Sequence, residues 1–332
     1  MRPAIDRFVP DIGRLRLTAG RWLAALLLLI AGCSCPALAR DEAADPVAAD
    51  SAGSRHGFLW EARKGARHAY LMGTLHVGLA SDYPPDGATQ HLLAGVDAFA
   101  LEDDVSQAQR TQDAVRSLAM YPAGEPGLDG RIDAQLKADC ERELGALGLP
   151  AAGAWRMKPW LLGSAMVILQ ASALGFSPSY ATEVYLAQLA RSLNRPIIEL
   201  EGIEAQFALL DASPWPQQVD FLRQTVSSIR SGEAENDLRA LVAAWRASDA
   251  AAMTSYLDRV RHSDDPVERL WFARLVTQRN AGMAASIERL LQDGRLYLVA
   301  VGSLHYFGDD GLVETLRKRG YTVTALPQGA SR

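Results

Sequence analysis

The stretch of sequence that decides the fold is RLYLVAVGSLHYFGDDGLVETLRKRGYTV, residues 295–323. Leu296–Val301 is a continuous apolar run rich in β-forming residues, which is typical of a strand buried on both faces. The run ends in Gly-Ser-Leu-His at positions 302–305. Helical spacing follows over 312–319, with Gly320 as C-cap before another short apolar run. The pattern predicts a strand, a turn, a helix and a strand, with a histidine at the carboxyl end of the first strand.

A second copy of this pattern lies near the other end of the chain. Ala69–Gly78, AYLMGTLHVG, is an apolar run that ends in Gly-Thr-Leu-His at positions 73–76. The two Gly-x-x-His motifs use two of only six histidines. In open α/β sheets, ligands bind outside the carboxyl ends of the strands, so we expect His76 and His305 to meet in one crevice. We therefore interpret the pair as functional, although either motif alone is a weak signal.

Two further apolar runs predict strands that end on an acidic residue. Val96–Leu101 is followed by Glu102, and Pro196–Leu200 is followed by Glu201. With the two histidine motifs, four expected strands thus end on a polar side chain. A functional crevice needs this kind of convergence.

The remaining sequence has mostly helical spacing. We expect helical blocks around 105–195 and 204–293 to form a cap over the sheet. The predicted fold class is α/β, with a central β-sheet made from two similar halves. Each half carries one Gly-x-x-His strand end, and a large helical region covers the sheet. The domain is expected to span 57–326, with a short tail at 327–332.

The first 39 residues have the pattern of an export signal. Trp22–Gly32 is an apolar stretch that follows several arginines, long enough for a signal-peptide core and too short to span a bilayer. One interpretation is cleavage after the A-x-A site at 37–39, which would release a soluble protein with a flexible leader at 40–56. The other is a lipoprotein signal ending at residue 32, because 30–33 resembles a bacterial lipobox with Cys33 as the lipidated residue. Both predict export to the periplasm, with membrane contact only through the signal peptide or the lipid anchor.

The charge of the chain argues against a nucleic-acid partner. The net charge is −5 at pH 7, and residues 1–39 carry five arginines and two aspartates. Removing them takes the net charge to −8 (−5 minus 5 plus 2), so the mature chain has no basic footprint for phosphates. Cys140 is the one cysteine left in a soluble mature chain, which excludes an internal disulfide.

Taken together, the motifs resemble the TraB/GumN family, which is related to the TIKI proteases and more distantly to the erythromycin esterases. The similarity covers roughly Phe58 to Leu326. The residues that carry it are both Gly-x-x-His motifs, Leu101-Glu102, Lys158-Pro159-Trp160, the segment LEGIEAQ at 200–206, Arg279-Asn280, and the stretch from Val301 to Val323.

The resemblance implies a hydrolase whose active site combines the two histidines with a glutamate and an arginine. The positions that match are His76, His305, Glu102 and Arg279. The TIKI branch is described as metal-dependent proteases, whereas the esterase branch is usually drawn with a histidine as general base. The family therefore indicates a peptide or ester substrate without choosing between them.

The residue types suit hydrolysis with or without a metal. Two imidazoles and a carboxylate fit a divalent ion such as Mn, Co or Zn, which acidifies a bound water. In this hypothesis His76, His305 and Glu102 are the ligands, although Glu102 could instead be the general base. Glu201 orients Glu102 without binding the metal itself, and Arg279 stabilises the oxyanion.

Two alternatives remain open. In a metal-free, esterase-like hydrolase, one histidine is the general base and Glu102 holds it in the right tautomer. The other alternative is a non-catalytic periplasmic protein with a binding or regulatory role. The hydrolase hypothesis requires His76, His305 and Glu102 to lie near a common point, and dispersed side chains would favour the binding protein.

Overall fold

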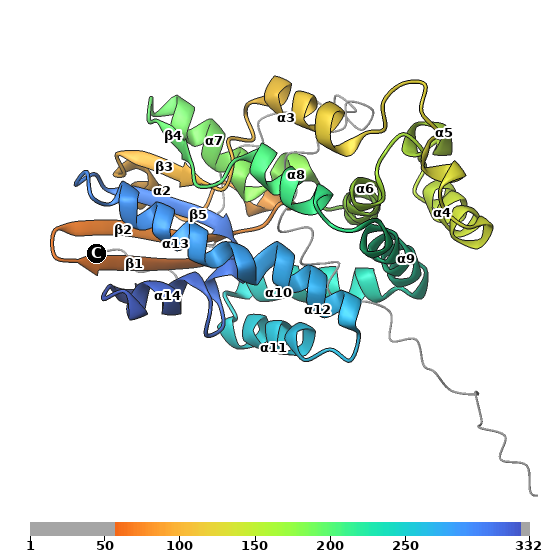
Figure 1. The fold of residues 1–332 in the computed structure, drawn as a ribbon. Coiled ribbons are helices and arrows are strands. Elements are labelled where there is room, and N and C mark those ends of the chain that lie inside the picture. The colour runs from red at the N-terminus through yellow and green to blue at the C-terminus, as the bar shows by residue number, and fades with distance from the viewer. Residues whose placement is uncertain (1–56, 327–332) are drawn as a thin grey trace, which may run out of the picture.

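The computed structural model describes residues 57–326, and the predictions for the signal peptide, Cys33, the leader and the tail lie outside this range. Within it, six strands form one sheet in the order β4-β3-β5-β2-β1-β6 (Figure 1). The strands are β1 (Phe58–Lys64), β2 (Arg67–Thr74), β3 (Ala98–Leu101), β4 (Ile197–Glu199), β5 (Tyr297–Gly302) and β6 (Thr322–Ala325). β2, β3, β4, β5 and β6 correspond to strands predicted from the sequence, and the predicted α/β class is confirmed.

Four neighbouring strands of the sheet run parallel. β4, β3, β5 and β2 are paired in parallel, whereas β1 is antiparallel to both β2 and β6. The central strand β5 comes from the C-terminal part of the chain and pairs on one side with β2, from the N-terminal part. Because parallel strands all point the same way, the ends of β4, β3, β5 and β2 lie along one edge of the sheet.

Both faces of the sheet are covered, which explains the uninterrupted apolar runs. On β5, Tyr297, Val299 and Val301 pack into one hydrophobic core. Leu298 and Ala300 pack into a second core on the opposite face. All six residues of β5 are buried, as period-2 alternation between two cores requires.

Helices make up most of the rest. The smaller core receives side chains from α2 (Gly87–Ala94) and α7 (Thr182–Ser192). The other helices are α3 (Ala108–Ala114), α4 (Ala134–Ala146), α5 (Ala151–Ala154), α6 (Pro159–Ala173), α8 (Ile203–Asp211), α9 (Trp215–Ser231), α10 (Glu233–Ala247), α11 (Ala250–Arg261), α12 (Pro266–Phe272), α13 (Gln278–Leu290) and α14 (Leu312–Lys318). In Figure 1, α4, α5, α6 and α9 gather at the opposite end of the molecule from the β1–β2 turn.

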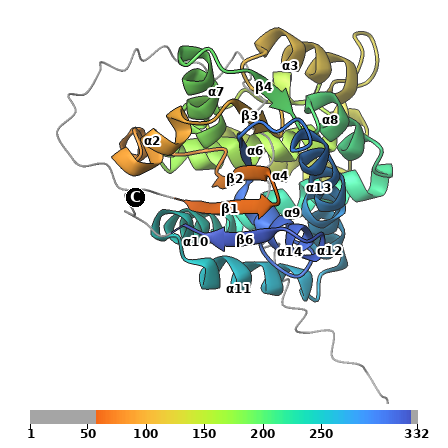
Figure 2. The ribbon, with the colours of Figure 1, turned by 90° about the vertical axis from the view of Figure 1, so that its left-hand side faces the viewer.

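The helices lie around the sheet on several sides. Figure 2 shows α2 and α7 on one side of the strands and α11 and α14 on the other. No helix within residues 57–326 is both long and apolar enough to cross a membrane. The division of the helices into a separate cap stays a prediction.

Candidate functional site

The four predicted strand ends lie next to one another. Glu201, Glu102, His305 and His76 follow β4, β3, β5 and β2, which is the order of these strands in the sheet. Three of the four side chains are almost completely enclosed, because His76, Glu102 and His305 are 3%, 1% and 1% exposed. The structure therefore brings the predicted residues to one edge of the sheet.

Glu102 is held by two donors from different parts of the chain. Its Oε1 accepts a hydrogen bond from the backbone N–H of Gly302 at 2.5 Å, and its Oε2 accepts one from Nη2 of Arg279 at 2.7 Å. Burial raises the pKa of Glu102, but the opposing effect of Arg279 and the neighbouring histidines is larger. The net result is a pKa of about 2, below the ordinary value of 4.5. Glu102 is therefore a fixed carboxylate across the physiological pH range.

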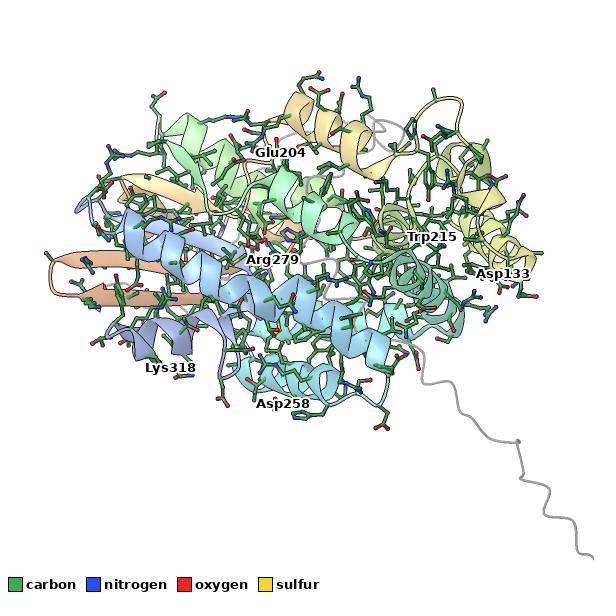
Figure 3. All side chains as sticks on the ribbon, in the orientation of Figure 1. Asp133, Glu204, Trp215, Asp258, Arg279 and Lys318 are labelled. Carbon is green, nitrogen blue, oxygen red and sulfur yellow. The ribbon has the colours of Figure 1, made fainter. Side chains whose placement is uncertain are left out.

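Arg279 reaches the strand ends from α13. α12 and α13 form one continuous helix through a π-helical segment at Ala273–Thr277, directly before Arg279. Such π turns are rare and are often found at functional sites. Figure 3 labels Arg279 where α13 passes the strand ends.

The guanidinium of Arg279 joins two acids. It donates from Nη2 to Glu102 and from Nε to Oε2 of Glu201 at 2.9 Å, and from Nη1 to the carbonyl oxygen of Leu275 at 3.0 Å. Burial lowers the pKa of Arg279, but the two carboxylates raise it above its ordinary value. Arg279 thus fixes both acids in this arrangement, and its role at an oxyanion stays a prediction.

His305 is a buried, neutral imidazole. It lies on the 3₁₀ turn Ser303–Tyr306, which directly follows β5. Its Nδ1 lies 2.7 Å from Oδ1 of Asn280, and its Nε2 lies 4.0 Å from Oε1 of Glu102. Burial lowers the pKa of His305 to about 3, although Glu102 opposes the shift. The ring is therefore uncharged at neutral pH.

His76 has the opposite electrostatic environment. Its Nδ1 lies 3.0 Å from Oε1 of Glu183, a fully buried residue in the first turn of α7. The hydroxyl of Thr74 donates to the same carboxylate oxygen. Burial lowers the pKa of His76, but Glu183, Glu102 and Asp103 raise it more, so the net shift is upward. The two histidines of the repeated motif therefore favour different charge states.

The sequence that forms these strand ends is similar to that of known proteins. A model of the TraB/PrgY/gumN family matches residues 58–325, which is most of the chain. The chain belongs to the TraB/PrgY/gumN family. The resemblance seen in the sequence motifs is thereby confirmed.

Curated relatives of this TraB/PrgY/gumN chain fall into two groups. It is 26% identical over 266 residues to proteins named "Uncharacterized protein YbaP" from Shigella flexneri and from Escherichia coli (strain K12), covering 76% of this chain and 89% of theirs. It is 24% identical over 171 residues to metalloprotease TIKI1 of Danio rerio, covering 44% of this chain and 34% of that protein. No solved structure matches the chain.

The predicted metal ligands do not form a three-ligand group in this arrangement. Within residues 57–326, Nε2 of His76 and Nε2 of His305 have no hydrogen-bond partner, which suits metal ligation. Both oxygens of Glu102, however, already accept hydrogen bonds from Gly302 and Arg279. Across the same range, no group of three or more His, Cys, Asp or Glu residues is arranged to hold an ion.

Three side chains of the site were missed in the sequence. Glu183 pairs with His76, Asn280 contacts His305, and Asp103 follows Glu102 in the chain. Asp103 is 5% exposed, and its Oδ2 has no hydrogen-bond partner in the described part of the chain. Burial and the neighbouring charge of Glu102 raise the pKa of Asp103 to about 7. The signals available were the acidic run after β3 and the position of Asn280 beside Arg279.

The hydroxyls that precede the two histidines behave differently. The Ser303 hydroxyl donates to the backbone oxygen of Thr74 at 2.9 Å, which joins the ends of β5 and β2. The Thr74 hydroxyl instead donates to Glu183, the partner of His76. Only Thr74 therefore takes part in holding a histidine, through an intervening carboxylate.

Proposed function

We propose that this chain is an exported, peptidase-like hydrolase whose active site is the strand-end cluster of His76, His305, Glu102 and Arg279. The observation that carries the proposal is the convergence of these side chains at the carboxyl edge of four parallel strands. The similarity to a protein named metalloprotease TIKI1 supports hydrolysis of a peptide-like bond. The perturbed pKa values of the clustered groups favour a hydrolase over a binding or regulatory protein, because acid–base chemistry needs such shifts.

The division of charge between the groups suits acid–base chemistry. His305 is neutral, so its Nε2 can accept a hydrogen bond from a water molecule and orient it. The raised pKa of His76 favours an imidazolium that donates to a developing oxyanion. Glu102, with a pKa of about 2, is too weak a base to take a proton efficiently, and we assign it the role of positioning Arg279.

We assign proton transfer to Asp103, which directly follows Glu102 after β3, is 5% exposed and has an Oδ2 without a hydrogen-bond partner within residues 57–326. Its pKa of about 7 lies close to neutral pH, where a general base and a general acid are both available. In the proposed reaction, the water oxygen bonds to the carbonyl carbon while a water proton passes to the Asp103 carboxylate. The tetrahedral intermediate then breaks its bond to the leaving nitrogen or oxygen, which receives the proton from Asp103.

The central test is a pair of isosteric changes on purified protein, screened with peptide and ester substrates. His76→Gln should lower kcat/KM by about 10²–10³-fold, the usual cost of losing an oxyanion donor, and His305→Gln by about 10²-fold through misplacement of the water, while the circular dichroism spectrum stays unchanged. His262→Gln is the matched control, because His262 contacts the backbone oxygen of Asp258 on the surface. Hydrolysis that is unaffected in both cluster variants would remove the proposal.

A divalent metal is a separate prediction about the same site. The Nε2 atoms of His76 and His305, which have no hydrogen-bond partner within residues 57–326, favour a metal. Metal analysis of the purified protein decides it: one equivalent of Mn, Co or Zn, lost in His76→Ala and His305→Ala, would support a metal. Activity that survives full chelation without bound metal would exclude it.

Two finer parts of the proposal rest on other observations. Export rests on the first 39 residues alone, and N-terminal analysis of the mature protein distinguishes a start at Arg40 from a lipidated Cys33.

The idea of two similar halves is supported by the neighbouring positions of the two motifs, since Thr74 pairs with Gly302 between β2 and β5. A solved structure in which the halves superimpose would test it.

A further inference from the structure

Of the two ring nitrogens of His305, only Nδ1 has a hydrogen-bond partner within residues 57–326. Its Nδ1 lies 2.7 Å from the side-chain oxygen of Asn280, and its Nε2 has no hydrogen-bond partner within residues 57–326. The ring is 1% exposed and Asn280 is 2% exposed. A buried ring cannot exchange its partners with bulk water, so its contact with Asn280 decides where the ring hydrogen sits.

The second contact of Asn280 fixes which way its amide group faces. The side-chain nitrogen Nδ2 of Asn280 donates to the backbone carbonyl oxygen of Asp310 at 2.9 Å. A carbonyl oxygen can only accept, so the amide atom that faces Asp310 has to be the nitrogen. The amide oxygen is therefore the atom that faces His305. An amide oxygen also only accepts, so Nδ1 of His305 carries the hydrogen.

A neutral imidazole has one ring hydrogen, so Nε2 is left with its lone pair. The other tautomer would place a hydrogen on Nε2, toward Oε1 of Glu102. Those two atoms are 4.0 Å apart, which is too long for a hydrogen bond, whereas the contact with Asn280 has a normal length. The short contact therefore decides between the tautomers.

We propose that Asn280 is a positioning residue that holds His305 in the tautomer with hydrogen on Nδ1, so that the Nε2 lone pair is available to a ligand in the strand-end cluster. Arg279 and Asn280 are consecutive on α13, so one helical turn fixes Glu102 through the first and His305 through the second. His76 is held by the carboxylate of Glu183 instead, so only His305 depends on an uncharged partner. The consequence for catalysis rests on the proposed function, whereas the tautomer does not.

Nitrogen NMR of the protein with ¹⁵N-labelled histidine rings tests the assignment directly. The chain has six histidines, and His305→Gln identifies the signals of His305 by their loss. In the wild type, Nδ1 should show the signature of a protonated ring nitrogen and Nε2 that of an unprotonated one. Hydrogen on Nε2 in the wild type would overturn the proposal.

Two variants and one control complete the test. Asn280→Ala removes the acceptor and should give signals of both tautomers, whereas Asn280→Asp keeps an acceptor and should retain hydrogen on Nδ1. Thr315→Val is the control, because the Thr315 hydroxyl contacts the same Asp310 carbonyl oxygen at 3.4 Å without touching the ring. A folded Asn280→Ala protein with an unchanged tautomer would also overturn the proposal. The wild-type and Asn280→Asp spectra decide the question if Asn280→Ala does not fold.

The activity measurement is kept apart from the NMR result. If the proposed hydrolase activity is found, Asn280→Ala should lower kcat about 10–100-fold, as loss of an orienting partner does, with little change in KM. A retained activity in a protein whose tautomer has changed would contradict the role of the tautomer in catalysis. If the wild type shows the expected tautomer but no hydrolysis, the proposed function fails while the assignment of Asn280 stands.

Discussion

Replacing Arg279 with methionine should expose the electrostatic cost of the buried cluster. Arg279 is 7% exposed and is bonded to Glu102, which is 1% exposed. Removing one partner of a buried pair leaves an uncompensated charge and typically costs about 3–5 kcal/mol. The lowered pKa of Glu102 gives a similar figure: a shift from 4.5 to about 2 corresponds to about 3 kcal/mol of stability above pH 4.5. We therefore expect Arg279→Met to lower the free energy of unfolding by about 3–5 kcal/mol at pH 7.

The effect should depend on pH in a defined direction. A carboxylate with a depressed folded-state pKa contributes stability that is present above its unfolded pKa and is lost as the pH falls through its folded pKa. In the wild type, this contribution of Glu102 disappears between pH 4.5 and about 2. The cost of Arg279→Met should therefore shrink as the pH falls, because burial raises the pKa of the unpaired Glu102 carboxyl, which can then be protonated.

Urea denaturation followed by circular dichroism measures the effect. Arg319→Met is the matched control, because Arg319 pairs with Glu288 at 2.7 Å where both side chains are about a quarter to a third exposed, and exposed pairs contribute about 0–1 kcal/mol. The double variant Arg279→Met with Glu102→Gln should recover part of the loss, since it removes the stranded charge. The reasoning is refuted if Arg279→Met costs no more than Arg319→Met, or if Glu102→Gln recovers nothing.

Two further predictions concern packing and the second histidine. A Cβ atom at Gly163 in α6 would collide with the ring of Phe221, so Gly163→Ala should destabilise the protein by about 1–3 kcal/mol. Gly282→Ala on α13 has open space and should instead stabilise it by about 0.4–1 kcal/mol, so thermal unfolding that shifts both the same way would contradict the packing. Glu183→Gln should lower the pKa of His76 in an NMR titration, because Glu183 is the main group opposing the effect of burial. A raised histidine pKa contributes stability below the unfolded pKa, so this variant should lose most stability at acidic pH, and an equal loss at pH 9 would speak against the pair.

The sequence by itself determined the sheet and the residues at its edge. Apolar runs marked the central strands β3 and β5, because a strand buried on both faces has no polar positions to interrupt it. The Gly-x-x-His motifs and the acids after β3 and β4 were visible because the chain places them directly after those runs. The position of a strand and the residue that follows it are local features of the chain, so the local sequence is enough to predict them.

Only the tertiary structure decided what each polar group does. Glu183 and Asn280 lie 107 and 25 residues from the histidines that they contact (183 minus 76, and 305 minus 280), so no local pattern links them. Glu102 accepts hydrogen bonds from Gly302 and Arg279, two donors that lie 200 and 177 residues away in the sequence. The pKa values of His76 and His305 move in opposite directions because burial acts on both, while a carboxylate lies against one ring and an amide against the other. Burial and long-range contacts exist only in the folded chain, and they set the chemistry of this site.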